Sequence, residues 1–371
     1  RGLGDVYKRQ VRENGMAYNS YVVIGEKVAV TDTVDARFVD EWLGNVETAL
    51  DGRTPDYLVV HHMEPDHSAG IVAFMDRYPD ARVVASKMAF KMMAAYFGTD
   101  FSDRQIVCKE GFELDLGDRT LRFIGAANVH WPEVMFSYDS QDKVLFSADA
   151  FGKFGANDIE DPEGWACEAR RYYFGIVGKF GKNVQAVLQK VAAFDVECIC
   201  PLHGPVLSEN LAYYVETYTT WAHYEPENSG VAIAYASVYG HTKQAAEELA
   251  RALEERGQTV SLFDLARDDM AEAVEDAFRY DRLVLASLTY AGDIFPFMTT
   301  FIHTLAEHAY QNRKVAFIES GTWAPVAAKA MRAQMEQMAG IEFAETVVTV
   351  RGSVDDAARA QIAALANELA S

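Results

Sequence analysis

Between Val231 and Leu369 the sequence repeats a single pattern, in which a short apolar run is followed by an amphipathic stretch. Short apolar runs bounded by Gly and polar residues are typical of buried strands, and the stretches between them have helical spacing. Five strands that alternate with five helices predict a doubly wound parallel sheet. The expected strands are Val231–Ala236, Thr259–Asp264, Leu283–Ser287, Val315–Glu319 and Val347–Arg351, and the expected helices are Thr242–Arg256, Met270–Phe278, Pro296–Ala309, Ala327–Ala339 and Asp355–Leu369.

The preceding part of the chain has a different pattern, because hairpin signals are mixed with helices. Apolar and β-branched residues in Ser20–Ile24 and Lys27–Asp32 flank Gly25-Glu26, which predicts a hairpin. This mixture predicts an α/β sandwich rather than a purely parallel sheet. Pro, Gly and polar residues gather at Tyr224–Gly230, so we expect a boundary there between domains 1–226 and 229–371. Further strands are expected at Tyr57–Val60, Arg82–Val84, Leu121–Ile124, Val144–Ser147 and Glu197–Cys200, and helices at Ala36–Leu50, Ser86–Tyr96, Asn183–Phe194 and Ser208–His223.

The composition limits the classes of partner and site. The 371 residues carry a formal net charge of −21, a field that repels nucleic-acid backbones and anionic lipids. We therefore expect no nucleic-acid partner, and no apolar run approaches the roughly 20 residues that span a membrane. The 4 cysteines form no CxxC pair, which argues against a disulfide framework, a thiolate zinc site and a rubredoxin-type iron site. Any metal site must use His and carboxylates.

The N-terminus begins Arg1-Gly2-Leu3, without Met and without the pattern of a signal peptide. The first ten or so residues are polar and non-periodic. We expect an incomplete N-terminus and a cytoplasmic protein.

A cluster of metal-binding residue types follows the expected strand Tyr57–Val60. The segment His61-His62-Met63-Glu64-Pro65-Asp66-His67 contains three histidines and two carboxylates, which are ligands that suit divalent first-row metals. Because His62, Glu64 and Asp66 alternate in the sequence, an irregular loop can present them to two adjacent ions. The alternative is a polar loop in which His is enriched by chance.

Three more potential ligands stand where expected strands end. His130 lies beyond Leu121–Ile124, Asp149 follows Val144–Ser147, and His203 follows Glu197–Cys200. Each of them alone is more often structural, since an Asp after a strand usually forms a turn or a cap. Four strand-end loops with ligand chemistry can nevertheless converge at one edge of a sandwich, which favours a metal site.

The His-x-x-x-Asp-His frame of this cluster, with the later His, Asp and His, resembles the metallo-β-lactamase fold. Hydrolases of that fold usually carry His-x-His-x-Asp-His, whereas this sequence has Glu64 in place of the second His. A carboxylate at that position favours iron over zinc. The His-x-Glu-x-Asp-His variant, followed by His130-Trp131-Pro132, resembles the flavodiiron proteins, also called A-type flavoproteins. The resemblance extends from about Ser20 to the C-terminus and implies a metallo-β-lactamase-like αββα sandwich followed by a flavodoxin-like domain.

The resemblance also implies a site for two iron ions. One iron would be held by His62, Glu64 and His130. The second would be held by Asp66 and His203, with His67 as a variable ligand, and Asp149 would bridge the two irons. His61 has no role in the motif and is expected to be structural, and Trp131 would form a wall of the pocket.

The first strand of the C-terminal part runs into a loop that begins at Ser237 and then into a helix. Hydroxyl groups, backbone N–H groups and a helix N-terminus at the end of a strand predict an anion site, and simple helix capping is the alternative. The sequence lacks GxGxxG and Walker A motifs, which disfavours a dinucleotide or a triphosphate. The motif resembles the phosphate-binding loop of flavodoxins, Ser/Thr-x-Tyr/Trp-Gly-x-Thr. This implies FMN binding by Ser237, Val238, Tyr239, Gly240, His241 and Thr242.

Two further loops at strand ends of the same sheet offer aromatic side chains and backbone donors to a flavin ring. Leu288 and Ala291 stand where family members commonly have Pro and Asn, and Thr322 precedes Trp323 where Gly is usual, so the ring contacts depart from the family pattern. The residues expected to contact the flavin are Leu288, Thr289, Tyr290, Ala291 and Gly292, and then Ser320, Gly321, Thr322 and Trp323.

The resemblance implies a reductase that passes electrons from FMN to the diiron site, where O2 is reduced to water or NO to N2O. It implies a head-to-tail homodimer or a dimer of dimers, and an external electron donor, with rubredoxin favoured over a reduced deazaflavin or another flavoprotein. Two other functions stay open: a zinc-dependent hydrolase of the lactamase fold with an accessory flavodoxin-like domain, and a flavin electron carrier with a vestigial metal domain. The sequence does not distinguish O2 from NO.

Overall fold

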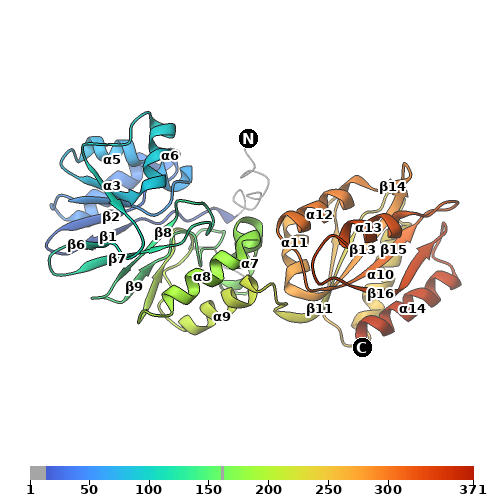
Figure 1. Cartoon of the computed structure of the whole chain (residues 1–371). Coiled ribbons are helices and arrows are strands. Elements are labelled where there is room, and N and C mark those ends of the chain that lie inside the picture. The colour runs from blue at the N-terminus through green and yellow to red at the C-terminus, as the bar shows by residue number, and fades with distance from the viewer. Residues whose placement is uncertain (1–13, 160–162) are drawn as a thin grey trace. The chain divides into compact units, whose positions relative to one another are not determined.

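The computed structural model describes residues 14–159 and 163–371, and the chain divides after Thr219 into two compact units (Figure 1). The polar first ten residues, expected to be a ragged end, lie outside the described residues. The boundary expected at Tyr224–Gly230 stays a prediction. In the part of the chain that the structure describes, no helix combines the length and the apolar character needed to cross a membrane.

The first unit contains two five-stranded sheets. The first sheet has the order β1-β2-β3-β4-β5, in which β1 and β2 form the predicted antiparallel hairpin and the other neighbours are parallel. The second has the order β10-β9-β8-β7-β6 and is antiparallel except between β10 and β9. The strands are β1 (Tyr21–Ile24), β2 (Val28–Thr31), β3 (Tyr57–Val60), β4 (Arg82–Ser86), β5 (Gln105–Cys108), β6 (Glu113–Asp115), β7 (Thr120–Gly125), β8 (Met135–Asp139), β9 (Val144–Phe146) and β10 (Cys198–Cys200).

Helices lie on the outer sides of the two sheets, with α3, α5 and α6 on one side and α8 and α9 on the other (Figure 1). One apolar core, which includes Val59, Phe123 and Phe146, joins the inner faces of the sheets. A second core, which includes Trp42 and Phe74, fills the space between the first sheet and its helices. The unit is therefore the predicted αββα sandwich. Its α-helices are α3 (Val39–Leu50), α4 (Pro65–Ser68), α5 (Ile71–Arg77), α6 (Lys87–Phe97), α7 (Ala166–Tyr172) and α8 (Gly181–Val191), and α9 (Leu211–Ala222) leads into the second unit.

The second unit has the predicted doubly wound sheet. Its strand order is β12-β11-β13-β15-β16, and all of these pairs are parallel. In chain order this is 2-1-3-4-5, the order of flavodoxin-like folds. One face is covered by α10 and α14, and α11, α12 and α13 cover the other (Figure 1). The elements are β11 (Asn228–Tyr235), α10 (His241–Glu254), β12 (Val260–Asp264), α11 (Met270–Arg279), β13 (Tyr280–Tyr290), β14 (Asp293–Ile294), α12 (Pro296–Glu307), β15 (Lys314–Ser320), α13 (Ala327–Met335), β16 (Glu342–Val350) and α14 (Asp356–Ala370).

The structure corrects the sequence pattern in two places. Strands β5, β6 and β8 are absent from the prediction, and β8 is buried on both faces, including Ser137 and Asp139, so it shows no alternation. The strand expected to end at Ser287 continues to Tyr290 and pairs antiparallel with β14. Ala291 and Gly292 connect these two strands, and both have positive φ, which is the backbone of a tight two-residue hairpin turn.

Candidate metal centre and cofactor site

The first unit brings all of its predicted metal ligands to one edge of the sandwich. His62, Glu64, Asp66 and His67 lie just after β3, partly on the short helix α4. His130 precedes β8, Asp149 follows β9, and His203 follows β10. These positions form two groups of side chains whose ligand atoms lie within 4.8 Å of one another in each group. We name them the His62 group (His62, Glu64, His130, Asp149) and the His203 group (Asp66, His67, His203).

In the His62 group, two imidazoles converge on two carboxylates. His130 Nε2 lies 3.1 Å from Glu64 Oε2 and 3.1 Å from Asp149 Oδ2. His62 Nε2 lies 3.5 Å from the same Glu64 oxygen and 3.4 Å from the same Asp149 oxygen. Four donor atoms therefore face one small volume, as a metal position requires.

In the His203 group, His67 Nε2 and His203 Nε2 lie only 2.9 Å apart. Asp66 supplies one oxygen 3.7 Å from His67 Nε2 and the other 3.6 Å from His203 Nε2. Asp149 also reaches this group, because its Oδ1 lies 3.3 Å from His67 Nε2 and 3.9 Å from His203 Nε2. One oxygen of Asp149 thus faces each group, which is the arrangement of a bridging carboxylate.

The arrangement of the donor atoms suits bound cations better than it suits hydrogen bonds among the ligands themselves. His62 Nε2 and Asp149 Oδ1 are buried and have no hydrogen-bond partner among the described residues. Burial disfavours the charged form of Asp149, but His62 and His67 outweigh it and hold the pKa of Asp149 well below its ordinary value. For His203, burial and the neighbouring His67 lower the pKa to about 4, which leaves a neutral imidazole. A carboxylate that stays anionic, with the neutral imidazole of His203 beside it, suits iron or another divalent metal.

Hydrogen bonds behind the ligands fix which ring nitrogen points at the metal positions. His62 Nδ1–H donates to Glu133 Oε1 at 2.8 Å, and His203 Nδ1–H donates to the Ala17 carbonyl at 2.8 Å. Both rings therefore present an Nε2 lone pair to the site. Such partners orient ligands and raise their basicity. The sequence pattern did not identify Glu133, although it stands directly after the quoted His-Trp-Pro segment.

Residues just before β1 and at its start hold the loop of His203. The Asn19 amide donates to the carbonyls of Pro201 and Gly204, each at 2.8 Å, so it spans the turn that carries His203. Tyr21 donates its hydroxyl to the same Pro201 carbonyl at 2.7 Å. A sequence pattern gives no sign of these contacts, because the partners are separated by about 180 residues.

His61 has the structural position that the sequence predicts. Its ring points into the core between the sheets and stacks on Phe123 and Phe146. Its Nδ1–H donates to Asp32 Oδ2 at 2.6 Å, and its Nε2 lies 2.8 Å from Ser137 Oγ. Trp131 instead lies against the metal ligands, with its ring centroid 5.2 Å from that of His62.

In the second unit, the first candidate cofactor loop joins β11 to α10. Gly240 precedes α10 with φ of 92°, a conformation that favours glycine, and its N–H donates to Ser237 Oγ. The helix N-terminus that follows favours an anion. Tyr239 in this loop is 88% exposed, an unusual state for a large aromatic side chain. The loop therefore fits a ligand that has a phosphate and an aromatic ring.

The other two candidate loops are connected to the first and to each other. Thr242 Oγ1 lies 2.8 Å from Ser320 Oγ, which joins the first loop to the third. Thr289 Oγ1 accepts from the N–H groups of Val326 and Ala327, which joins the second loop to the start of α13. Trp323 in the third loop is 90% exposed. The three loops thus form one edge of the sheet, and each carries an exposed ring, since Tyr290 of the second loop is 51% exposed.

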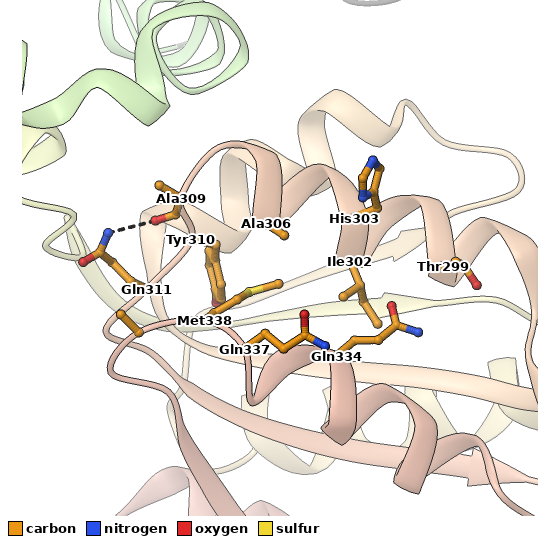
Figure 2. Close-up of a pocket in the computed structure, with 11 residues that line it drawn as sticks. Thr299, Ile302, His303, Ala306, Ala309, Tyr310, Gln311, Gln334, Gln337 and Met338 are labelled. Atoms are coloured by element: carbon orange, nitrogen blue, oxygen red, sulfur yellow. Dashed lines mark hydrogen bonds between the residues drawn. The ribbon is translucent and has the colours of Figure 1, made fainter.

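A cavity of about 580 Å³ lies elsewhere in this unit, between α12 and α13 (Figure 2). Tyr310 and Met338, which line it, precede β15 and β16, so the cavity lies at the edge of the sheet opposite the candidate cofactor loops. None of the candidate flavin residues lines it. The cavity is therefore separate from the site that the sequence predicts.

Comparisons with protein families match both units. Residues 16–204 match the family described as ODP family beta lactamase, and residues 232–357 match a flavodoxin domain. The two matches together cover the candidate metal ligands and the three candidate cofactor loops.

Similar proteins carry both parts. A nitric oxide reductase from Moorella thermoacetica is 30% identical over 299 residues, which is 78% of this chain and 74% of that protein. The solved structure of rubredoxin oxygen:oxidoreductase from Desulfovibrio gigas has a TM-score of 0.88 and 26% identity, covering 96% of this chain and 90% of that one. A putative diflavin flavoprotein A 1 from Thermosynechococcus vestitus is 29% identical over 315 residues, 83% of this chain, and the chain spans about half of its length (54%).

Proposed function

This chain belongs to the flavodiiron protein family of oxidoreductases, and from that membership we propose that it passes electrons from FMN to two iron ions that reduce O2 to water, NO to N2O, or both. The observation that carries the proposal is the position of Asp149, whose two oxygens face the two groups of potential ligands. A chance cluster of polar residues would not be expected to form two groups of potential ligands on either side of one shared carboxylate.

In the metal centre, we propose that His62, Glu64 and His130 hold one iron and that Asp66, His67 and His203 hold the other. Asp149 binds both and offsets part of their charge. His67 belongs in this set because its Nε2 faces both Asp149 and His203. When bound, the iron ions would supply redox chemistry toward a diatomic gas, and FMN would supply electrons.

The side chains around the centre limit what reaches it. Tyr172 is buried with its ring centroid 5.4 Å from that of His203, and Trp131 packs against His62. Both walls are aromatic, so the ligands on these sides face apolar rings rather than polar groups. Glu133 and the Ala17 carbonyl keep the ligand rings in place while the charge of the centre changes.

In the flavodoxin-like unit, we propose that the loop from Ser237 to Thr242 holds the FMN phosphate. The helix dipole of α10 and the hydroxyls of Ser237 and Thr242 favour its negative charge. Tyr239 and Trp323 then cover the flavin ring, which would account for their exposure. Leu288 to Gly292 and Ser320 to Thr322 would contact the rest of the cofactor.

We further propose that the electron donor is a small redox protein of the rubredoxin type. The name of the Desulfovibrio gigas relative supports this donor. We propose a head-to-tail homodimer, or a dimer of dimers, in the cytoplasm.

The test is steady-state turnover with each gas under anaerobic control. Protein loaded with iron and FMN is supplied with reduced rubredoxin and either O2 or NO, and consumption of the gas and formation of N2O are followed. Turnover with at least one gas supports the proposal. Turnover with neither gas, in protein that contains stoichiometric zinc and hydrolyses esters or amides, would refute it.

A further inference from the structure

Two adjacent histidines at the end of β3 each donate to a buried carboxylate, but only one of them faces the metal positions. His61 donates to Asp32 at 2.6 Å and points into the core. His62 donates to Glu133 at 2.8 Å and points its other nitrogen at Asp149. The Asp32–His61 pair lies in the core of the sandwich and faces no metal position. The buried carboxylate of Glu133, in contrast, accepts a hydrogen bond from a candidate metal ligand.

Glu133 is held by one of its two oxygens. Its Oε1 accepts from His62 Nδ1–H and from the Met63 N–H at 2.9 Å, whereas Oε2 is buried and has no hydrogen-bond partner among the described residues. The side chain is 0% exposed. Burying a carboxylate costs several kcal/mol unless a positive charge lies close by, and an amide would accept the same two hydrogen bonds. The charge of Glu133 therefore acts through His62 on the cation that His62 binds.

Among the described residues, no carboxylate accepts a hydrogen bond from Nδ1 of either ring of the His203 group. The Nδ1–H of His203 donates to a neutral backbone carbonyl, that of Ala17. The Nδ1 of His67 is buried without a hydrogen-bond partner among the described residues. A carboxylate partner makes an imidazole a stronger donor than a carbonyl partner does, because it stabilises positive charge on the ring.

We propose that Glu133 makes the two metal positions unequal, so that the position of His62, Glu64 and His130 holds its iron more tightly, and holds it ferric at more negative potentials, than the position of Asp66, His67 and His203. Glu133 is a positioning residue here, because it acts through His62. The inference rests on the proposed function, since it presupposes that both positions bind iron. The iron of the His203 group is therefore expected to be lost first and to be reduced first.

The experiment compares the two irons in one protein. Holoprotein enriched in 57Fe is exposed to a strong chelator, and the iron that remains is followed by Mössbauer spectroscopy, which separates the two sites by their quadrupole doublets. In the unaltered protein we expect release in two phases, with one doublet lost before the other. Glu133→Gln keeps an acceptor oxygen for both hydrogen bonds and removes the charge. We expect it to accelerate the slow phase by roughly 10- to 100-fold, to leave the fast phase unchanged and to alter only the slower doublet.

The matched control is Asp32→Asn, which removes the buried carboxylate charge that accepts from the adjacent His61. Its Oδ1 still accepts the backbone N–H of His61, so we expect both doublets and both release rates to persist. Equal release rates of the two irons in the unaltered protein overturn the proposal, and so does an equal effect of Glu133→Gln on both doublets. Protein that never binds a second iron contradicts the proposed function instead.

Discussion

Replacing the shared carboxylate and replacing a ligand of one group should have different effects on iron content. Asp149 is fully buried, and each of its oxygens faces a different group. Asp149→Ala therefore removes a ligand from both metal positions at once. His203→Ala removes a ligand from the His203 group and leaves the four side chains of the His62 group intact.

The size of the effect follows from the number of donors. Each position has four side-chain donors when Asp149 is counted for both. Loss of a residue that only supports a ligand costs roughly 10- to 100-fold in metal affinity, so loss of a direct ligand costs at least that much. Asp149→Ala lowers the metal affinity of both positions and also removes the negative charge that lies between the two cations. We expect iron to fall from about two per chain to well below one in Asp149→Ala, and to about one in His203→Ala.

The assay is iron analysis per chain after gel filtration against a weak chelator, with FMN content as an internal standard. Glu110→Ala is a suitable control, because Glu110 is an exposed carboxylate of the same unit that pairs with Lys190. We expect this control to keep its full iron content. If Asp149→Ala retains two irons, or loses no more iron than His203→Ala, Asp149 does not bridge the two positions.

Three further predictions concern stability and the cofactor. Arg313 is buried and donates to the carbonyls of Tyr224, Phe278 and Tyr280, so Arg313→Met should cost roughly 3–5 kcal/mol and lower the melting temperature by about 10 °C. The exposed Arg351→Met should change little in calorimetry, and equal melting temperatures of the two variants would contradict this role of Arg313. Thr242→Val removes the hydroxyl that meets Ser320 and should weaken FMN binding by about 5- to 10-fold in a fluorescence titration, and an unchanged Kd would show that the hydroxyl has no part in the site. In metal-free protein the pKa of His62 and that of His130 are raised, because the carboxylates beside them outweigh the effect of burial. Protonation of these two rings therefore stabilises the fold fully below about pH 6.5, the pKa of an unfolded His. This stabilisation is lost as the pH rises through the raised pKa values. The melting temperature of metal-free protein should therefore fall more steeply between pH 7 and pH 9 than that of iron-loaded protein, in which the metal takes the place of the protons, and parallel curves would be the contrary result.

The sequence was informative where function imposes a residue type at the end of a strand. His62, Glu64, His130 and Asp149 could be singled out as candidate ligands because several strand ends carry imidazoles or carboxylates and because their spacing resembles that of a known family. The doubly wound sheet could be predicted because each strand is a short apolar run between amphipathic helices. The structure confirms this sheet and gives its strand order, β12-β11-β13-β15-β16.

The sequence was uninformative where long-range contacts decide the role of a residue. Glu133 and Asp32 look like ordinary polar residues, and only the fold places them behind His62 and His61. Strand β8 could not be found because both of its faces are buried, which removes the alternation that marks a strand. The hairpin at Ala291-Gly292 was missed because its residues were assigned to a cofactor loop, and the turn is formed by backbone conformation rather than by a typical Asn-Gly pair.

The most direct test of the proposed electron path is the rate at which the reduced flavin is reoxidised. Protein containing FMN and iron is reduced anaerobically and mixed in a stopped-flow instrument with buffer containing O2 or NO, and flavin absorbance is followed. The same protein with FMN but with its iron removed is the comparison. We predict rapid reoxidation by at least one gas in the iron-loaded protein and a rate lower by about 100-fold or more without iron, a ratio that corresponds to about 3 kcal/mol of activation free energy. Equal rates with and without iron would contradict the account.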